Sequence, residues 1–291
     1  MVFAIALKQE QYKTYVLSEQ LSQSRLEVVP ERGGIITSWQ VRGQELLYLD
    51  AERFANPDQT VRGGIPILFP ICGNLPDGTY THNNQTYSLK QHGFARNLPW
   101  EVTDRITHDR VGITLVLNSN DETRAVYPFD FQLAFSYFLQ GTTLEIVQRF
   151  TNRSSELMPF STGLHPYFLA TDKSQLQFSI PGDRCVDQQT GNEQSFSGSF
   201  DFEKDEIDVA FRPVTRQSAS VSDASRNLEL RLDYDSTYST LVFWTVKGKE
   251  YYCLEPWSAP RNALNTGENL TYLESGQSLE TLVRLTVTPF P

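Results

Sequence analysis

The hydrophobic residues of this chain recur mostly at every second position, and this period constrains the fold more than any other feature of the sequence. Several segments are rich in Val, Ile, Thr, Tyr and Phe and tend to alternate apolar with polar positions, which is typical of half-buried β-strands. They span residues 12–18, 25–29, 111–117, 131–138, 143–150, 228–232, 240–246 and 282–287. The alternation predicts an all-β protein.

Turn-forming residues such as Asp77-Gly78 separate these segments about every ten residues, which is the turn spacing of antiparallel sheets. Helices are expected only at residues 51–54 and 121–126, the second capped by Asn120 or Asp121. We therefore expect a large antiparallel β-sandwich, formed by two sheets packed face to face, with very few short helices.

The whole chain, residues 1–291, is expected to form one domain. No repeat with a period of roughly 20 to 50 residues is present, which argues against a propeller or a solenoid. Residues 187–208 are the most polar stretch, but strand-like runs flank them on both sides. We interpret them as a long loop within one domain rather than as a linker.

The charge balance limits the class of partner. The chain has 25 Lys and Arg residues against 35 Asp and Glu residues, a net charge of −10. Nucleic acids and acidic membranes are held mainly by basic residues, so neither is expected as a partner. A small anion could still be bound locally by a few arginines.

Compartment and redox chemistry follow from weaker signals. No apolar stretch approaches the roughly 20 residues that span a bilayer, and the short run 2–7 lacks the flanks of a secretory signal, so we expect a cytoplasmic protein. Cys72, Cys185 and Cys253 are odd in number and form no CxxC pair. They are expected to be reduced thiols without a catalytic role, and neither a disulfide framework nor a thiolate zinc site is indicated.

The first chemically unusual region combines residues 62–74 with residues 91–97. Paired glycines and two prolines interrupt an apolar run there, which is unfavourable for strand pairing and suits a loop that walls a ligand site. Arg62, His92 and Arg96 would bring cationic or donor groups to that loop. The alternative is that His92 is a structural histidine and the arginines are ordinary surface charges.

Two further regions each place one titratable side chain before a proline. His165 is followed by Pro166 and two aromatic residues, whose rings could contact the apolar face of a sugar. Glu255 ends an apolar strand next to Pro256 and is either solvated or part of a partly buried floor. A structural role for His165 remains open on the sequence alone.

Together these regions resemble the aldose 1-epimerase (galactose mutarotase-like) superfamily, near the branch of hexose-6-phosphate mutarotases and related aldose epimerases. The resemblance rests on sequence blocks whose order and spacing run over most of the chain. They are RGGIPILFPICG at 62–73, HGFARNLPWEV at 92–102, GLHPYF at 163–168, YYCLEPW at 251–257 with the following NALNTG, and LESGQSLE at 273–280. It implies a mutarotase-type β-sandwich with a sugar pocket, an isomerase of carbohydrate metabolism that needs neither a metal nor another cofactor.

The resemblance also implies catalytic roles. Glu255 corresponds to the general base, His165 to the general acid, and His92 to a second histidine that helps to bind the sugar. An acid and a base of this kind can open the C1–O5 bond of a pyranose and let it close as the other anomer. We expect Glu255, with an ordinary pKa of about 4.3, to be ionised, and a neighbouring carboxylate to raise the pKa of His165 from about 6.5.

For the substrate, the resemblance places Arg96 at the ligand and matches Arg62 to an arginine near the phosphate of hexose phosphates. Asp208 is the candidate for an acidic residue that binds sugar hydroxyls. A guanidinium matches phosphate oxygens well, which favours a hexose 6-phosphate. The sequence at 71–74, Ile-Cys-Gly-Asn, departs from the phosphate-binding members, so a free hexose remains open, and the oligomeric state is not indicated.

Two other functions compete with an epimerase. One is a carbohydrate-binding β-sandwich without catalysis, which would not need both Glu255 and His165. The other is a sugar lyase or hydrolase, which would need paired carboxylates across a scissile bond. The epimerase hypothesis requires that Glu255 and His165 meet at a single cavity of sugar size.

Overall fold

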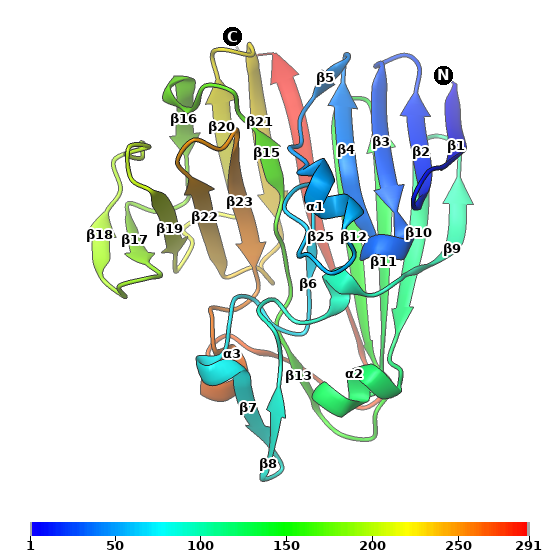
Figure 1. The fold of residues 1–291 in the computed structure, drawn as a ribbon, viewed down its shortest axis with the longest axis vertical. Coiled ribbons are helices and arrows are strands. Elements are labelled where there is room, and N and C mark those ends of the chain that lie inside the picture. Colours follow the sequence, from blue (N-terminus) through cyan, green and yellow to red (C-terminus); the bar gives the residue numbers. More distant parts are fainter. Residues whose placement is uncertain (1, 290–291) are drawn as a thin grey trace.

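The computed structural model describes residues 2–289 and is shown in Figure 1. Two large layers of strands dominate it. One layer is a single eight-stranded sheet, which we call the long-strand sheet. Its order is β16 (Leu176–Ser179), β20 (Ser218–Asp223), β21 (Leu228–Tyr234), β25 (Ser278–Pro289), β12 (Thr143–Asn152), β11 (Phe131–Gln140), β10 (Val111–Asn118) and β9 (Glu101–Ile106).

The second layer contains two sheets. The site sheet has the order β18 (Glu193–Ser195), β17 (Arg184–Asp187), β19 (Glu206–Phe211), β22 (Thr240–Val246), β23 (Tyr251–Trp257), β14 (Gly163–Leu164) and β6 (Ile67–Leu68), with β15 (Tyr167–Leu169) also paired to β23. The N-terminal sheet runs β1 (Phe3–Gln9), β2 (Lys13–Glu19), β3 (Ser24–Val29), β4 (Ile35–Val41) and β5 (Gln44–Glu45).

Smaller elements close the ends of the sandwich. There are two short two-stranded sheets. One is a hairpin of β7 (Thr79–His82) and β8 (Gln85–Ser88), and the other pairs β13 (Met158–Phe160) with the distant β24 (Thr271–Leu273). The helices are α1 (Ala51–Ala55), α2 (Asp121–Val126) and α3 (Ala263–Thr266), with 3₁₀ turns η1 (Pro30–Arg32), η2 (Pro76–Gly78), η3 (Ala95–Asn97) and η4 (Lys173–Gln175). Within residues 2–289, no helix has the length and apolar character that crossing a bilayer would require.

The predicted all-β, antiparallel sandwich is confirmed, with two differences. The layer that carries the site is built from two sheets, joined by isolated bridges such as Ile36 to Ile65. The interpretation of residues 187–208 as one long loop is wrong, because they contain β18 and the start of β19. β18 was not recognised because its three residues, Glu193–Ser195, are polar and all exposed at the edge of the sheet.

The core between the layers is formed by the inward faces of alternating strands. In β11 and β12, every second residue is buried, as alternation predicts. Phe135 of β11 lies at the centre, with its ring centroid 5.1 Å from Trp100 and 5.7 Å from Phe150. The Tyr137 hydroxyl donates to the carbonyl of Gly34 at 2.7 Å, which links the long-strand sheet to the N-terminal segment.

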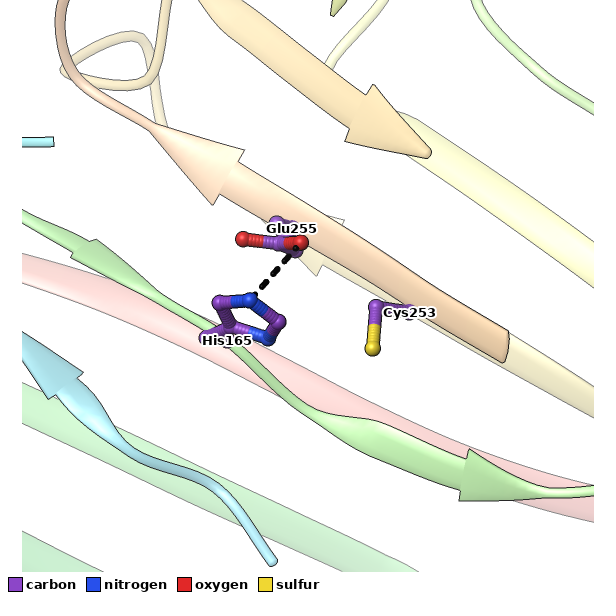
Figure 2. Close-up of side chains that lie close together, drawn as sticks. All are labelled: His165, Cys253 and Glu255. Carbon is purple, nitrogen blue, oxygen red and sulfur yellow. Dashed lines mark ion pairs between the residues drawn. The ribbon is translucent and has the colours of Figure 1, made fainter. Parts of the chain in front are cut away.

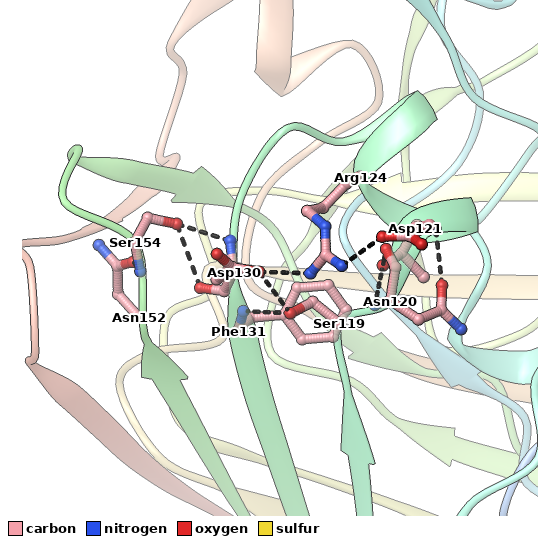
Figure 3. Close-up of polar contacts among 9 residues, drawn as sticks. Ser119, Asn120, Asp121, Arg124, Asp130, Phe131, Asn152 and Ser154 are labelled. Atoms are coloured by element: carbon pink, nitrogen blue, oxygen red, sulfur yellow. Dashed lines mark hydrogen bonds and ion pairs between the residues drawn. The ribbon is translucent and has the colours of Figure 1, made fainter.

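The predicted helix at 121–126 is present, and Asn120 caps it (Figure 3). The Asn120 side chain accepts from the Thr123 N–H, and the Thr123 hydroxyl accepts from the Asn120 N–H, both at 2.9 Å, which is a capping box. Arg124 donates to Asp121 and to Asp130, each at 2.6 Å. These contacts attach the helix to the residue that precedes β11.

Candidate active site

One cavity of about 460 Å³ lies on the side of the site sheet that faces away from the sandwich core. It is lined mainly by charged, polar and aromatic side chains. These are Arg53, Thr60, Val61, Arg62, Gln91, His92, Arg96, His165, Tyr167, Gln189, Glu206, Asp208, Val242, Trp244, Glu255, Trp257 and Arg261. All six residues that the sequence proposes for the site therefore line this one cavity.

Strand β23 supplies the wall that carries the carboxylate. Tyr252 and Leu254 belong to the main core, so the period of two turns Cys253, Glu255 and Trp257 toward the opposite face. All seven residues of β23 are buried, which means that both faces of this strand are covered. Glu255 is thus held on a rigid central strand, only 1% exposed.

His165 reaches Glu255 from the turn between β14 and β15 (Figure 2). Its Nε2 lies 3.3 Å from Oε1 of Glu255, and the Trp257 indole N–H donates to Oε2 at 3.0 Å. The His165 N–H donates to the Pro66 carbonyl at 3.0 Å, which fixes the turn. The two side chains lie side by side on the cavity wall, so the spatial condition of the epimerase hypothesis is met.

The glycines before Pro66 have a specific steric role in this arrangement. Gly64 has φ +62°, and a Cβ at this position would lie 2.2 Å from the carbonyl oxygen of Ile36. The Gly64 carbonyl accepts from the Tyr167 N–H at 2.9 Å, just beyond His165. Glycine therefore lets the 62–74 segment approach the N-terminal sheet closely while it supports the histidine turn.

The expected protonation states of the pair are wrong in direction. Burial raises the pKa of Glu255 well above its ordinary value, and the nearby Asp208 carboxylate adds to this effect. Burial also lowers the pKa of His165 to about 3, with the Arg96 guanidinium acting in the same direction. The sequence argument considered only the neighbouring carboxylate of His165, and the loss of hydration outweighs that attraction.

His92 is fixed as a neutral N–H donor. Its ring Nδ1 accepts from the Gly73 N–H at 3.0 Å, and the backbone N–H of His92 donates to the Gly73 carbonyl at 2.7 Å. The pKa of His92 lies well below its usual value, chiefly because the ring is buried and secondarily because of Arg96. With Nδ1 occupied as an acceptor, the remaining hydrogen sits on Nε2. The ring centroid is 5.4 Å from that of His165.

The two predicted arginines differ in their contacts. Arg96 donates to the Gln91 carbonyl at 2.9 Å, and its Nε is buried without a hydrogen-bond partner. Arg62 makes no side-chain hydrogen bond or ion pair with any residue in 2–289, and its guanidinium carbon lies 5.8 Å from the Trp244 ring centroid. Arg62 is therefore a charge in the cavity wall without an ion-pair partner among the described residues.

The comparison with known protein families decides the classification. The family model described as aldose 1-epimerase matches residues 20–286, which is most of the chain. The chain belongs to the aldose 1-epimerase family.

Solved structures of related proteins have the same fold as this family member. A structure of the Slr1438 protein from Synechocystis sp. PCC 6803 is 46% identical, with a TM-score of 0.95 over 98% of this chain and 99% of that one. A galactose mutarotase-like protein from Clostridium acetobutylicum is 22% identical, with a TM-score of 0.85 over 99% of both chains. The second likeness concerns the fold alone.

A curated relative carries a more specific name. A protein of Escherichia coli K12, provisionally named glucose-6-phosphate 1-epimerase, is 31% identical over 159 residues, which is 54% of this chain and 49% of that protein. A protein of Cenchrus ciliaris with the same provisional name is 33% identical over 50% of this chain and 44% of its own length. The chain thus spans about half the length of the curated relatives it matches.

The hydrogen bonds of Asp208 in this aldose 1-epimerase family member were not predicted from the sequence. Asp208 lines the cavity as expected, but its carboxylate already accepts from Arg261 at 2.6 Å and from Gln188 at 2.7 Å. Arg261 lies in an irregular segment after β23, directly before the NALNTG block that begins at Asn262, and Gln188 lies in the polar stretch between β17 and β18. No sequence signal pairs these positions.

The cysteine nearest to the pair also raises the question of a metal. Donor atoms of His165, Cys253 and Glu255 lie within 4.8 Å of one another, all in buried residues. Burial raises the pKa of the Cys253 thiol well above its ordinary value, so it is not a ready thiolate ligand. Arg62 and Arg96 add positive charge to the same wall, which disfavours a cation there. Cys72, Cys185 and Cys253 are all free and buried.

Proposed function

We propose that this protein interconverts the α and β anomers of a hexose 6-phosphate, with Glu255 and His165 as the proton-transferring pair. The observation that supports this most directly is their contact at 3.3 Å on the wall of a cavity large enough for a phosphorylated sugar. Membership of the aldose 1-epimerase family supports the reaction type.

Ring opening needs one proton removed and one proton delivered. The Glu255 carboxylate takes the proton of the C1 hydroxyl, the C1–O5 bond breaks, and His165 gives a proton to O5. The product is the open-chain aldehyde, with Glu255 protonated and His165 neutral. After rotation about C1–C2, O5 attacks C1 again, His165 recovers its proton, and Glu255 returns its proton to O1.

The pair carries a single proton through this cycle, and ring opening begins only after that proton has moved from Glu255 to His165 across their 3.3 Å contact. Burial favours uncharged forms of both groups, namely protonated Glu255 and neutral His165. Protonated Glu255 and neutral His165 accompany the aldehyde. The closed ring requires ionised Glu255 and protonated His165. Burial therefore lowers the free energy of the ring-opened stage relative to the closed stage. His92, fixed as a neutral donor, can hold a sugar oxygen without competing for the proton.

The catalytic assignment is tested by anomer exchange. Exchange spectroscopy by NMR would measure α-to-β interconversion of glucose 6-phosphate with the wild-type protein and with Glu255→Gln. Loss of the base should reduce the enzymatic rate by about a hundredfold or more. An unchanged rate in Glu255→Gln would contradict the assignment, and ligand binding without any acceleration by the wild type would instead favour a carbohydrate-binding protein.

Arg62 is the strongest support for a phosphorylated substrate, because a half-buried guanidinium without an ion-pair partner is suited to a phosphate. Arg62→Gln should raise the KM for glucose 6-phosphate about tenfold while it leaves the KM for glucose nearly unchanged. Glucose thus serves as the internal control for a damaged cavity. Equal effects on both sugars, or equal turnover of both by the wild type, would argue for a free hexose.

A further inference from the structure

Arg261 connects several parts of the cavity through one guanidinium. Its Nη2 donates to Oδ2 of Asp208 at 2.6 Å, and its Nη1 donates to Oδ1 of Asn74 at 3.3 Å. The other carboxylate oxygen of Asp208 accepts from Gln188 at 2.7 Å. Asp208 is therefore held from both sides, and its side chain is only 10% exposed.

The path of Arg261 depends on the glycine that precedes Asn74. Gly73 has φ +71°, and a Cβ built there would lie 2.3 Å from Cγ of Arg261. The N–H of the same glycine donates to Nδ1 of His92, and its carbonyl accepts from the backbone N–H of His92. Residue 73 must consequently be small, because its backbone holds the histidine while the arginine stem fills the space where a side chain would stand.

The charges around Glu255 explain why this ion pair matters at the site. Asp208 approaches Glu255 from β19 and raises the pKa of the base, whereas the guanidiniums of Arg261 and Arg96 lower it. Burial raises the pKa of Asp208 too, and Arg261 counteracts this shift. The titratable or charged groups that face Glu255 from all surrounding elements are Cys72, Arg96, His165, Tyr167, Asp208, Cys253 and Arg261.

We propose that Arg261 is a positioning residue for the reaction at Glu255. It holds Asp208 in place and neutralises that second carboxylate beside the base. Its side chain occupies the space that Gly73 leaves free. This inference rests on the proposed function for its catalytic meaning. Without Arg261, two buried carboxylates would share one cavity wall, and each would oppose ionisation of the other.

The experiment compares Arg261→Gln, Arg261→Lys and the double variant Asp208→Asn/Arg261→Gln. The titration of the Glu255 carboxyl is followed by carbon NMR, with Glu255→Gln identifying the signal, and the pH profile of anomer exchange is recorded in parallel. In Arg261→Gln, the Glu255 titration should move upward on the order of one pH unit, and the pH–rate profile should move to higher pH with it.

Removal of the second carboxylate should reverse this change, so the double variant should titrate closer to the wild type than Arg261→Gln does. Arg261→Lys keeps the charge but loses the forked contact to Asp208 and Asn74, so it should titrate near the wild type and show a raised KM. Arg212→Gln is the matched control, because Arg212 forms an ion pair with Glu268 near the surface at 2.6 Å. It should leave the Glu255 titration unchanged.

The carboxyl titration does not depend on turnover, which separates this proposal from the proposed function. An inactive wild type would contradict the epimerase assignment while the titration still tested the role of Arg261. A Glu255 titration that is the same in Arg261→Gln as in the wild type would overturn the proposal. So would an upward shift that Asp208→Asn fails to reduce, because the charge of Asp208 would then not be what Arg261 neutralises.

Discussion

The long-strand sheet and the site sheet use β-strands in different ways. In β11, buried residues alternate with half-buried ones over ten positions, so one face packs on the core and the other meets solvent. In β23, all seven residues are buried, although the period of two still sends them to opposite sides. Both faces of β23 are covered, one by the core and the other by the walls of the cavity. The difference shows that the second buried face of β23 holds the site. The alternating strands of the long-strand sheet form the structural support beneath it, which we call the platform.

The largest effect on the free energy of unfolding should come from a cavity in the core of the long-strand sheet. Phe135→Ala removes a fully buried ring from the core side of β11, and such changes cost about 3–5 kcal/mol in unfolding free energy. Denaturant unfolding would measure this loss. The rate of anomer exchange per folded molecule should stay the same, because Phe135 does not reach the cavity. A lowered rate in the folded fraction would mean that the two sheets are less independent than this comparison states.

An intermediate effect is expected from His165 in acid. Its pKa falls from 6.5 to about 3 on folding, so between these values the unfolded chain binds a proton that the native state does not. Stability should therefore decrease as the pH falls through this range, and His165→Gln should remove about 2 kcal/mol of the decrease between pH 7 and pH 5.

Thermal or denaturant unfolding across this pH range would measure the slope. His108→Gln is the control, because the side chain of His108 is 93% exposed. A His165→Gln slope equal to that of the wild type would show that the imidazole is protonated in the native state.

The smallest effect on stability should come from replacing one carboxylate in each sheet, Glu255 in the site sheet and Glu145 in the long-strand sheet. The raised pKa of Glu255 means that the native state keeps a proton which the unfolded chain loses above pH 4.5, so stability falls as the pH rises through this range. Glu255→Gln should therefore be about 1 kcal/mol more stable than the wild type at pH 8 and closer to it at pH 4.5.

Glu145 of β12 provides the matched change in the long-strand sheet. It pairs with Arg284 at 2.7 Å and with Arg110 at 3.2 Å on a solvent-facing surface. Glu145→Gln should lower stability by less than about 1 kcal/mol at pH 8, the opposite sign to Glu255→Gln. The same sign in both variants would contradict the view that burial destabilises ionised Glu255.

The sequence could predict the platform because alternation is a local property. Strands such as β11 and β12 have one buried face, and the alternation of apolar and polar residues in their sequences predicts that face directly. The capped helix after Asn120 is equally local, since its cap and its first turn are neighbours in the chain. The motifs around His92 and Glu255 also carried enough information to place both residues at one site.

The rest of the site could not be predicted because it depends on contacts between distant segments. Arg261 and Asp208 are 53 positions apart, and neither belongs to a pattern that indicates the other. The polar strand β18 has no apolar face to reveal it. The direction of the pKa shifts at His165 depends on complete burial, and a single neighbouring carboxylate in the sequence gives no measure of burial.

The hydrogen bond from the Gly73 main chain to His92 has a consequence for how the cavity can change. The proton arrangement of this imidazole is imposed by a backbone N–H, which every amino acid except proline supplies. Side chains around it, such as Arg62 or Gln189, can be exchanged to accommodate a different sugar without disturbing that donor. The groups that differ between ligands are therefore recognised by exchangeable side chains. The His92 donor, which the backbone fixes, would be the same for every ligand of the cavity.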